Sequence, residues 1–131
     1  MTFVMDASIT ASWCFPDEAS PAADRAFVRI AKEKAVVPGH WWFELRNVLL
    51  VGERRGRLDA RQIRRFLELL RDLDIDVDRA PDEAATFDLA RRHALTFYDA
   101  AYLELALRHD AIASLDTALV KAASAESVVL V

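Results

Sequence analysis

The chain contains 131 residues, of which 53% are hydrophobic and 29% are charged, and this size and composition predict one globular domain over residues 1–131. No apolar run approaches the roughly 20 residues of a transmembrane helix, and no basic segment precedes the apolar N-terminus, so we expect a cytoplasmic protein with no membrane contact. The net charge of −4 excludes a molecule coated with positive charge for binding nucleic acid.

The first half of the chain alternates short strands with helices. A β-branched and apolar run over residues 2–6 predicts a strand that ends at Asp6. Ser20 and Pro21 are typical of a helix N-cap and first position. The further elements predicted here are a helical turn at 9–15, a helix at 21–34, a strand at 35–38, a helix at 40–56 that Gly56 ends, and a helix at 60–73 with Asp59 and Gln62 as its capping box.

The second half continues the alternation and defines the fold class. The elements predicted in it are a strand at 75–80, a helix from Pro81 to His93, a helix from Thr96 to His109, a strand at 111–115, a helix at 118–124 and a strand at 127–131. Strands separated by helices favour an α/β fold. We therefore expect three layers, α/β/α, around a central and mostly parallel sheet.

Four acidic residues occupy positions that can converge at one edge of this sheet. Asp6 ends the first strand, Asp116 ends the strand at 111–115, and Asp99 lies in the first turn of a helix. Glu44 shares the apolar stripe of its helix. Ligands of open parallel sheets bind at the carboxyl ends of the strands. Ionised carboxylates gathered there require a cation, and a set of oxygen donors favours Mg²⁺ or Mn²⁺ over zinc.

Each acid also has an ordinary structural interpretation. Asp6 and Asp116 have the positions of turn residues or helix N-caps. Thr96 and Asp99 have the spacing of a capping box. For Glu44, the alternative is an ion pair with an arginine. The interpretation as a metal site rests on the four acids occurring together.

A basic segment is the second candidate binding feature. Six arginines occur within twelve residues: Arg54, Arg55, Arg57, Arg61, Arg64 and Arg65. A local basic face on an acidic protein is suited to holding phosphates of RNA. The alternative is a solvated helix face, on which these arginines neutralise Glu53, Asp59 and Glu68.

The sequence also resembles a known family along its whole length. The segments that carry the resemblance are "VMDAS", "FELRNVL", "LTFYDAAYLELAL" and "IASLDTAL". They match in order and spacing the acidic blocks of PIN-domain proteins, and most closely those of VapC-type toxins of prokaryotic toxin–antitoxin pairs. The resemblance implies metal-binding acids at Asp6, Glu44, Asp99 and Asp116, with supporting polar residues at Ser8, Thr96 and Thr117.

The same resemblance implies an activity and partners. Family members use Mg²⁺ or Mn²⁺, as one or two ions, to hydrolyse RNA and leave a 3′-hydroxyl and a 5′-phosphate. They form homodimers, and a cognate VapB-type antitoxin occludes the site. Apolar residues of the first helices, Trp13, Phe15, Phe27 and Ile30, are expected to receive an apolar, helical antitoxin peptide that ends in a basic side chain.

Other classes of protein fit the sequence less well. Receiver-type signalling domains need a phosphoacceptor Asp after a central strand and a Lys after a later one, which residues 75–83 and 127–131 supply poorly. Haloacid-dehalogenase-type phosphatases need a second Asp where Ser8 stands. A housekeeping RNA-processing nuclease and a PIN-fold binding module without catalysis remain as alternatives to the toxin.

Overall fold

The computed structural model describes residues 2–131 and contains one five-stranded sheet. The strands lie in the order β3-β2-β1-β4-β5, and every neighbouring pair is parallel. Their bounds are β1 (Thr2–Met5), β2 (Lys34–Pro38), β3 (Ile75–Asp78), β4 (Ala111–Ala113) and β5 (Val129–Leu130). The predicted α/β class is confirmed, and the sheet of the described residues is parallel throughout.

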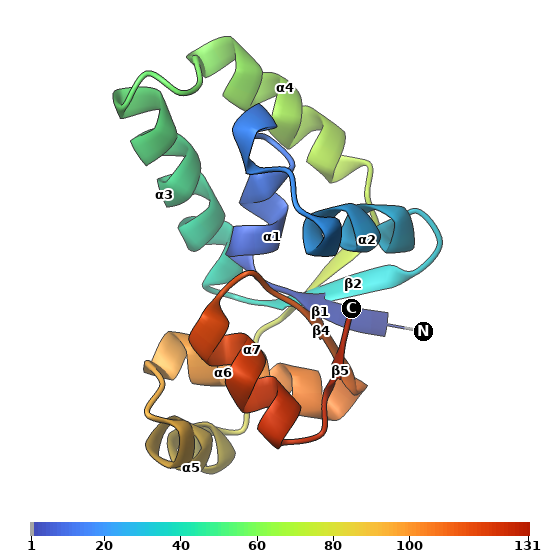
Figure 1. Cartoon of the computed structure of the whole chain (residues 1–131), viewed down its shortest axis with the longest axis vertical. Helices are drawn as coiled ribbons and strands as arrows, with labels where there is room; N and C mark the ends of the chain where they lie inside the picture. Colours follow the sequence, from blue (N-terminus) through green and yellow to red (C-terminus); the bar gives the residue numbers. More distant parts are fainter. Residues whose placement is uncertain (1) are drawn as a thin grey trace.

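Helices cover both faces of the sheet and complete a three-layer α/β/α fold (Figure 1). One layer contains α1 (Ala7–Ser12), the short 3-10 helix η1 (Pro16–Glu18), α2 (Pro21–Ile30), α3 (Trp41–Arg54) and α4 (Ala60–Arg71). The other layer contains α5 (Glu83–His93), α6 (Phe97–His109) and α7 (Thr117–Ala125). Within residues 2–131, none of these helices combines the length and apolar character needed to cross a bilayer.

Side-chain caps explain where several helices begin. The Ser20 hydroxyl accepts a hydrogen bond from Ala23 N at 3.1 Å, so α2 starts at Pro21 as predicted. Asp59 and Gln62 form the predicted reciprocal capping box of α4. Helix α5 begins two residues after the predicted Pro81, because the Asp82 side chain accepts a hydrogen bond from the amide of Ala85 and caps the helix there.

The central strands bring the two ends of the chain together. β1 pairs with β4 in the register Val4 to Ile112 and Met5 to Ala113. The order of the strands reverses between β1 and β4, because the chain proceeds from β1 toward β3 on one side and from β4 to β5 on the other. An open α/β sheet leaves a crevice at such a position, outside the carboxyl ends of its strands.

The predicted apolar surface of the first helices is only partly correct. Phe15 and Ile30 belong to the hydrophobic core, with 2% and 5% of their surface exposed. Phe27 is the exposed member at 55%, and it packs edge-on against Trp13 at 5.4 Å between ring centroids. The exposed apolar surface of this region therefore centres on Trp13 and Phe27.

Candidate active site

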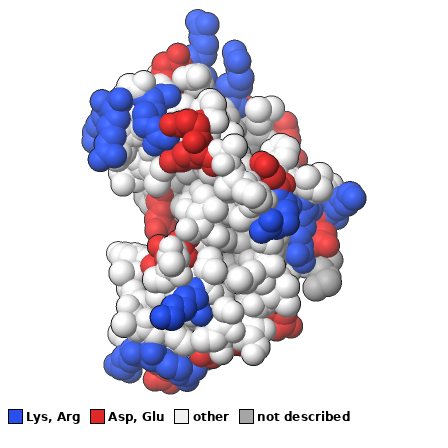
Figure 2. All heavy atoms as spheres, in the orientation of Figure 1, with Lys and Arg blue, Asp and Glu red and all other residues white. Residues whose placement is uncertain are grey.

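A cleft of 190 Å³ opens at the carboxyl ends of β1 and β4. Its lining comprises Asp6, Ala7, Ser8, Glu44, Val48, Asp99, Tyr102 and Asp116. All four acidic residues singled out from the sequence therefore lie at one cleft, although they come from the ends of two strands and from two helices of opposite layers. Figure 2 shows acidic side chains in the indentation between the two helical layers.

Asp6 is held at the base of the cleft by hydroxyl and amide donors. The Ser8 hydroxyl and the Ile9 amide donate to Oδ1 at 2.6 and 3.0 Å, and the Ser114 hydroxyl donates to Oδ2. Burial raises the pKa of Asp6, while these donors act in the opposite direction and the charge of Asp116 adds to the increase. Asp6 is thus a buried, oriented carboxyl whose charge is only partly compensated by the protein.

The loop after β4 ties Asp116 to the same network. The Asp116 amide donates to the Ser114 hydroxyl at 2.9 Å, and the Leu115 amide donates to the Ser8 hydroxyl at 3.0 Å. The Asp116 carboxylate accepts from the Leu119 amide at 2.9 Å and so forms the N-cap of α7. Asp6 caps α1 in the same way. Asp6 and Asp116 are therefore helix N-caps, as their positions in the sequence also allowed, and both line the cleft as well.

Glu44 is positioned by two aromatic residues. The Tyr102 hydroxyl donates to Glu44 Oε1 at 2.7 Å. His40 packs between the rings of Tyr98 and Tyr102, and its Nε2 lies 3.4 Å from the same oxygen of Glu44. Burial lowers the pKa of His40, which favours the neutral imidazole. Glu44 therefore contacts neutral groups rather than the arginine that the sequence also allowed.

Asp99 begins α6 on the opposite wall of the cleft. Its amide donates to the Thr96 hydroxyl at 3.1 Å, so Thr96 is the N-cap of the helix. Burial raises the pKa of the Asp99 carboxyl, and the charges of Asp116 and Glu44 raise it further. A carboxyl group near other carboxylates loses its proton less readily, because like charges repel.

The donor set of the cleft fits a hard divalent cation. Among the described residues that line it, four are carboxylates and none is a lysine or arginine, so the negative charge has no cationic partner in the lining. Within residues 2–131, no three acidic, histidine or cysteine side chains are gathered closely enough to form a complete set of direct ligands. Mg²⁺ commonly binds through one or two carboxylates and keeps several waters, which suits this arrangement.

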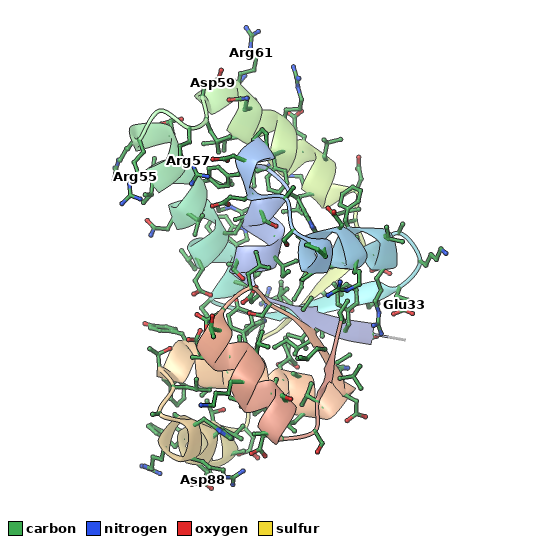
Figure 3. The ribbon with its side chains drawn as sticks, in the orientation of Figure 1. Glu33, Arg55, Arg57, Asp59, Arg61 and Asp88 are labelled. Atoms are coloured by element: carbon green, nitrogen blue, oxygen red, sulfur yellow. The ribbon has the colours of Figure 1, made fainter. Side chains whose placement is uncertain are left out.

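The six arginines lie at the far end of α3 and along α4, away from the sheet. In Figure 3, Arg55, Arg57 and Arg61 are labelled at this corner of the molecule. Arg54 follows Glu44 by ten residues on α3, which corresponds to about 15 Å along the helix axis. Arg57 contacts Asp17 and Glu18 at 3.0 and 3.2 Å and stacks over the Phe15 ring at 4.2 Å, so its main contacts are structural.

Three residues near the acids were not identified from the sequence: Tyr102, His40 and Ser114. Tyr102 follows Asp99 by three residues, a spacing that places both on one side of a helix and was available as a signal. His40 and Ser114 join the site through contacts between distant segments, which a single sequence does not reveal. Thr117, expected as a supporting residue, is exposed at the start of α7 and lies outside the described lining of the cleft.

Comparison with known proteins defines the family. A sequence model of the PIN domain matches residues 3–125, and the chain belongs to the PIN domain family. PIN domains are generally metal-dependent nucleases. The fold is similar to that in the crystal structure of PAE2754 from Pyrobaculum aerophilum, with a TM-score of 0.71, 24% sequence identity, and coverage of 93% of this chain and 84% of that chain. A search of curated proteins found no match.

Proposed function

We propose that the protein is a metal-dependent endoribonuclease. The observation that carries this proposal is the cleft where Asp6, Glu44, Asp99 and Asp116 meet without a lysine or arginine in the described lining. A structural ion pair does not account for four acids in one place. Nuclease chemistry does, because hydrolysis of a phosphodiester needs cations to offset the charge of both the carboxylates and the phosphate.

The four carboxylates have distinct supports in this proposal. Asp6 and Glu44 are oriented before any ion arrives, Asp6 by Ser8 and Ser114 and Glu44 by Tyr102. Together with Asp99 and Asp116 they would hold Mg²⁺ or Mn²⁺. The ion, when bound, lowers the pKa of water and withdraws charge from the phosphate. By resemblance to the family, water is the nucleophile and the products carry a 3′-hydroxyl and a 5′-phosphate.

The finer assignment is a VapC-type toxin that works as a homodimer and is inhibited by a VapB-type antitoxin. It rests on the sequence resemblance and on an apolar hollow of 280 Å³ beside α1 and α2, which Trp13 and Phe27 help to line. A bound antitoxin peptide would cover the exposed ring of Phe27 and reach the acids with a basic side chain. A housekeeping RNA-processing nuclease is the alternative with the same chemistry.

The experiment that tests the activity compares Asp99→Asn with the wild type on RNA in Mg²⁺. Asn keeps the size of the side chain and removes the charge, so we expect a folded variant without cleavage. Asp59→Asn is the matched control, since Asp59 caps the remote helix α4 and Asn is also a good cap. Equal cleavage by Asp99→Asn and the wild type would refute the assignment, and an inactive wild type would favour the non-catalytic binding module.

The toxin assignment needs its own measurement. The first observation is whether a small reading frame for a DNA-binding protein lies next to the gene. Its product is then co-expressed with the protein, and complexes are measured by light scattering and by the loss of RNA cleavage. We expect a dimer and an inhibited complex. Replacing Phe27 with Ser should weaken the complex without changing the cleavage by the free protein. An active monomer that does not bind the protein encoded by the adjacent reading frame would support the housekeeping nuclease instead.

A further inference from the structure

A hollow of 430 Å³ lies between α5 and α7, outside the acidic cleft. Basic side chains form one part of its lining, namely Arg92, His93 and Lys121. The other lining residues are alanines, namely Ala94 after α5 and Ala118, Ala122 and Ala125 of α7, the helix that also carries Lys121. The hollow therefore places cations beside small, uncharged side chains. The activity proposed above assigns it no role.

The cations of the hollow are unequally neutralised. Glu126 accepts hydrogen bonds from Arg92 Nη1 at 3.0 and 2.9 Å and contacts His93 Nε2 at 2.7 Å. This single carboxylate orients both side chains, while 57% of the Arg92 side chain stays exposed. Lys121 is exposed and forms no ion pair with any acid among residues 2–131. The group thus keeps an excess of positive charge on a protein that is acidic as a whole.

The hollow is connected to the acidic cleft through helix α7. Asp116 lines the cleft and caps α7, and Ala118 of the same helix already lines the hollow. Lys121 follows Asp116 by five residues, which is about 7.5 Å along the helix axis and about 140° around it. An RNA strand that leaves the cleft therefore has to turn around the N-terminal part of α7 to reach Lys121, and Ala118 is the α7 residue of the lining that lies between them in sequence.

The arginines of α3 and α4 lie on the other side of the cleft. They belong to the opposite helical layer, and Figure 3 shows Arg55 and Arg61 at one end of the molecule and Asp88 of α5 at the other. Phosphates are held by lysine and arginine through charge and hydrogen bonds, whatever the base sequence. A single-stranded RNA that crosses the acids has cations available on both sides.

We propose that the hollow between α5 and α7 binds a phosphodiester group of the RNA substrate, on the side of the scissile bond away from the arginines of α3 and α4. Lys121 supplies the free ammonium. Arg92, held in place by Glu126, supplies the guanidinium. The inference rests on the proposed ribonuclease activity, and it adds a subsite that positions the substrate without taking part in the chemical step.

The test measures the binding of a short fluorescein-labelled single-stranded RNA by anisotropy, in EDTA so that no cleavage occurs. The variants are Lys121→Ala and Lys121→Glu, and the control is Lys32→Glu, the same charge reversal on an exposed lysine of the opposite layer. One lost phosphate contact lowers the slope of log affinity against log salt by about 0.7 for single-stranded RNA. We expect this decrease for Lys121→Ala, weaker binding still for Lys121→Glu, and a smaller effect of Lys32→Glu.

Cleavage in Mg²⁺ provides the second measurement. The Lys121 variants should raise KM and leave kcat unchanged, because a positioning contact contributes equally to the ground state and the transition state. If the wild type binds and cleaves RNA while the Lys121 and Lys32 variants have the same RNA affinity, salt slope and KM, the subsite is refuted and the proposed ribonuclease activity is not affected. If the wild type neither binds nor cleaves RNA, the proposed function itself is refuted and the subsite with it.

Discussion

Tyr102 of α6 and Glu44 of α3 are joined by a hydrogen bond of 2.7 Å across 58 residues of sequence. Tyr102 is 1% exposed, and burial raises the pKa of its hydroxyl well above the usual value, so the phenol remains protonated and donates. The bond connects the two helical layers at the cleft. It also leaves Glu44 with one preferred orientation toward the other acids.

Replacing Tyr102 with Phe should therefore weaken metal binding more than folding. Groups that orient a metal ligand typically contribute 10- to 100-fold to affinity, so we expect the affinity for Mn²⁺ to fall by about tenfold. The loss of one hydrogen bond should lower the free energy of unfolding by about 1 kcal/mol. Isothermal titration with Mn²⁺ and urea unfolding give the two values. Tyr98→Phe, at an exposed hydroxyl, is the control, and equal Mn²⁺ affinities of the two variants would contradict the positioning role.

The raised pKa of Asp99 predicts how stability depends on pH in the absence of metal. Between the ordinary value of 3.8 and the raised value, the native state binds more protons at Asp99 than the unfolded state does. The stabilisation is thus complete below the ordinary pKa and is lost as pH rises through the raised one. In EDTA at pH 7, Asp99→Asn should melt at a higher temperature than the wild type, and the difference should disappear at about pH 3, below the ordinary pKa.

Adding metal should reverse this order. Binding to the native state stabilises the wild type according to the metal concentration, and the variant lacks one of the charges that hold the ion. Thermal melts by circular dichroism with and without Mg²⁺ measure both effects. A variant that melts below the wild type in EDTA at pH 7 would mean that the Asp99 charge supports the fold rather than opposing it.

The arginines of α4 are predicted to bind RNA without affecting the chemical step. Replacing Arg61, Arg64 and Arg65 with Ala should reduce the slope of log affinity against log salt by about 2, at about 0.7 for each lost phosphate contact. KM should rise and kcat should remain near the wild-type value. Anisotropy over a range of salt concentrations and steady-state cleavage test the two statements.

Arg57 offers an internal comparison for this surface. Its guanidinium contacts Asp17 and Glu18 and covers the Phe15 ring, so Arg57→Ala should lower stability slightly and change the salt slope less than the triple substitution. An unchanged slope in the triple variant would leave the alternative of a solvated helix face, and the acidic cleft would be unaffected by that result.

Gly52 of α3 is predicted to be required for packing rather than for backbone flexibility. A Cβ at this position would lie 2.6 Å from Cε1 and Cζ of Phe15, whose ring is in the core. Alanine gains about 1 kcal/mol of helix propensity, but overpacking typically costs about 1–3 kcal/mol. We expect Gly52→Ala to be destabilised by about 1 kcal/mol in urea. Gly39→Ala is the control, because a Cβ at that position has no atom within 4 Å. A Gly52→Ala protein as stable as the wild type would contradict the close contact between α3 and the Phe15 ring.

The fold and the convergence of the four acidic residues could be predicted from the sequence, because both depend on the local pattern of strands, helices and the residues that follow the strands. Asp6 and Asp116 each follow a short apolar strand, and parallel strands place such residues at the same edge once they are neighbours. The cap of α5 at Asp82 was missed because Pro81 gave an equally strong local signal. The bond from Tyr102 to Glu44 and the ion pairs of Arg57 join distant segments, and single-sequence periodicity contains no information on them.

The pairing of β1 with β4 also determines when the cleft first exists during synthesis of the chain. Asp116 follows Asp6 by 110 residues, and at about 5–20 residues per second the ribosome needs about 6–22 s to add the second after the first. Until then β1 has only β2 beside it in the sheet, and Asp6 has neither the Ser114 hydroxyl nor Asp116 nearby. The growing chain is surrounded by ribosomal and messenger RNA throughout this interval, and it carries an incomplete set of carboxylates until its last helix has begun.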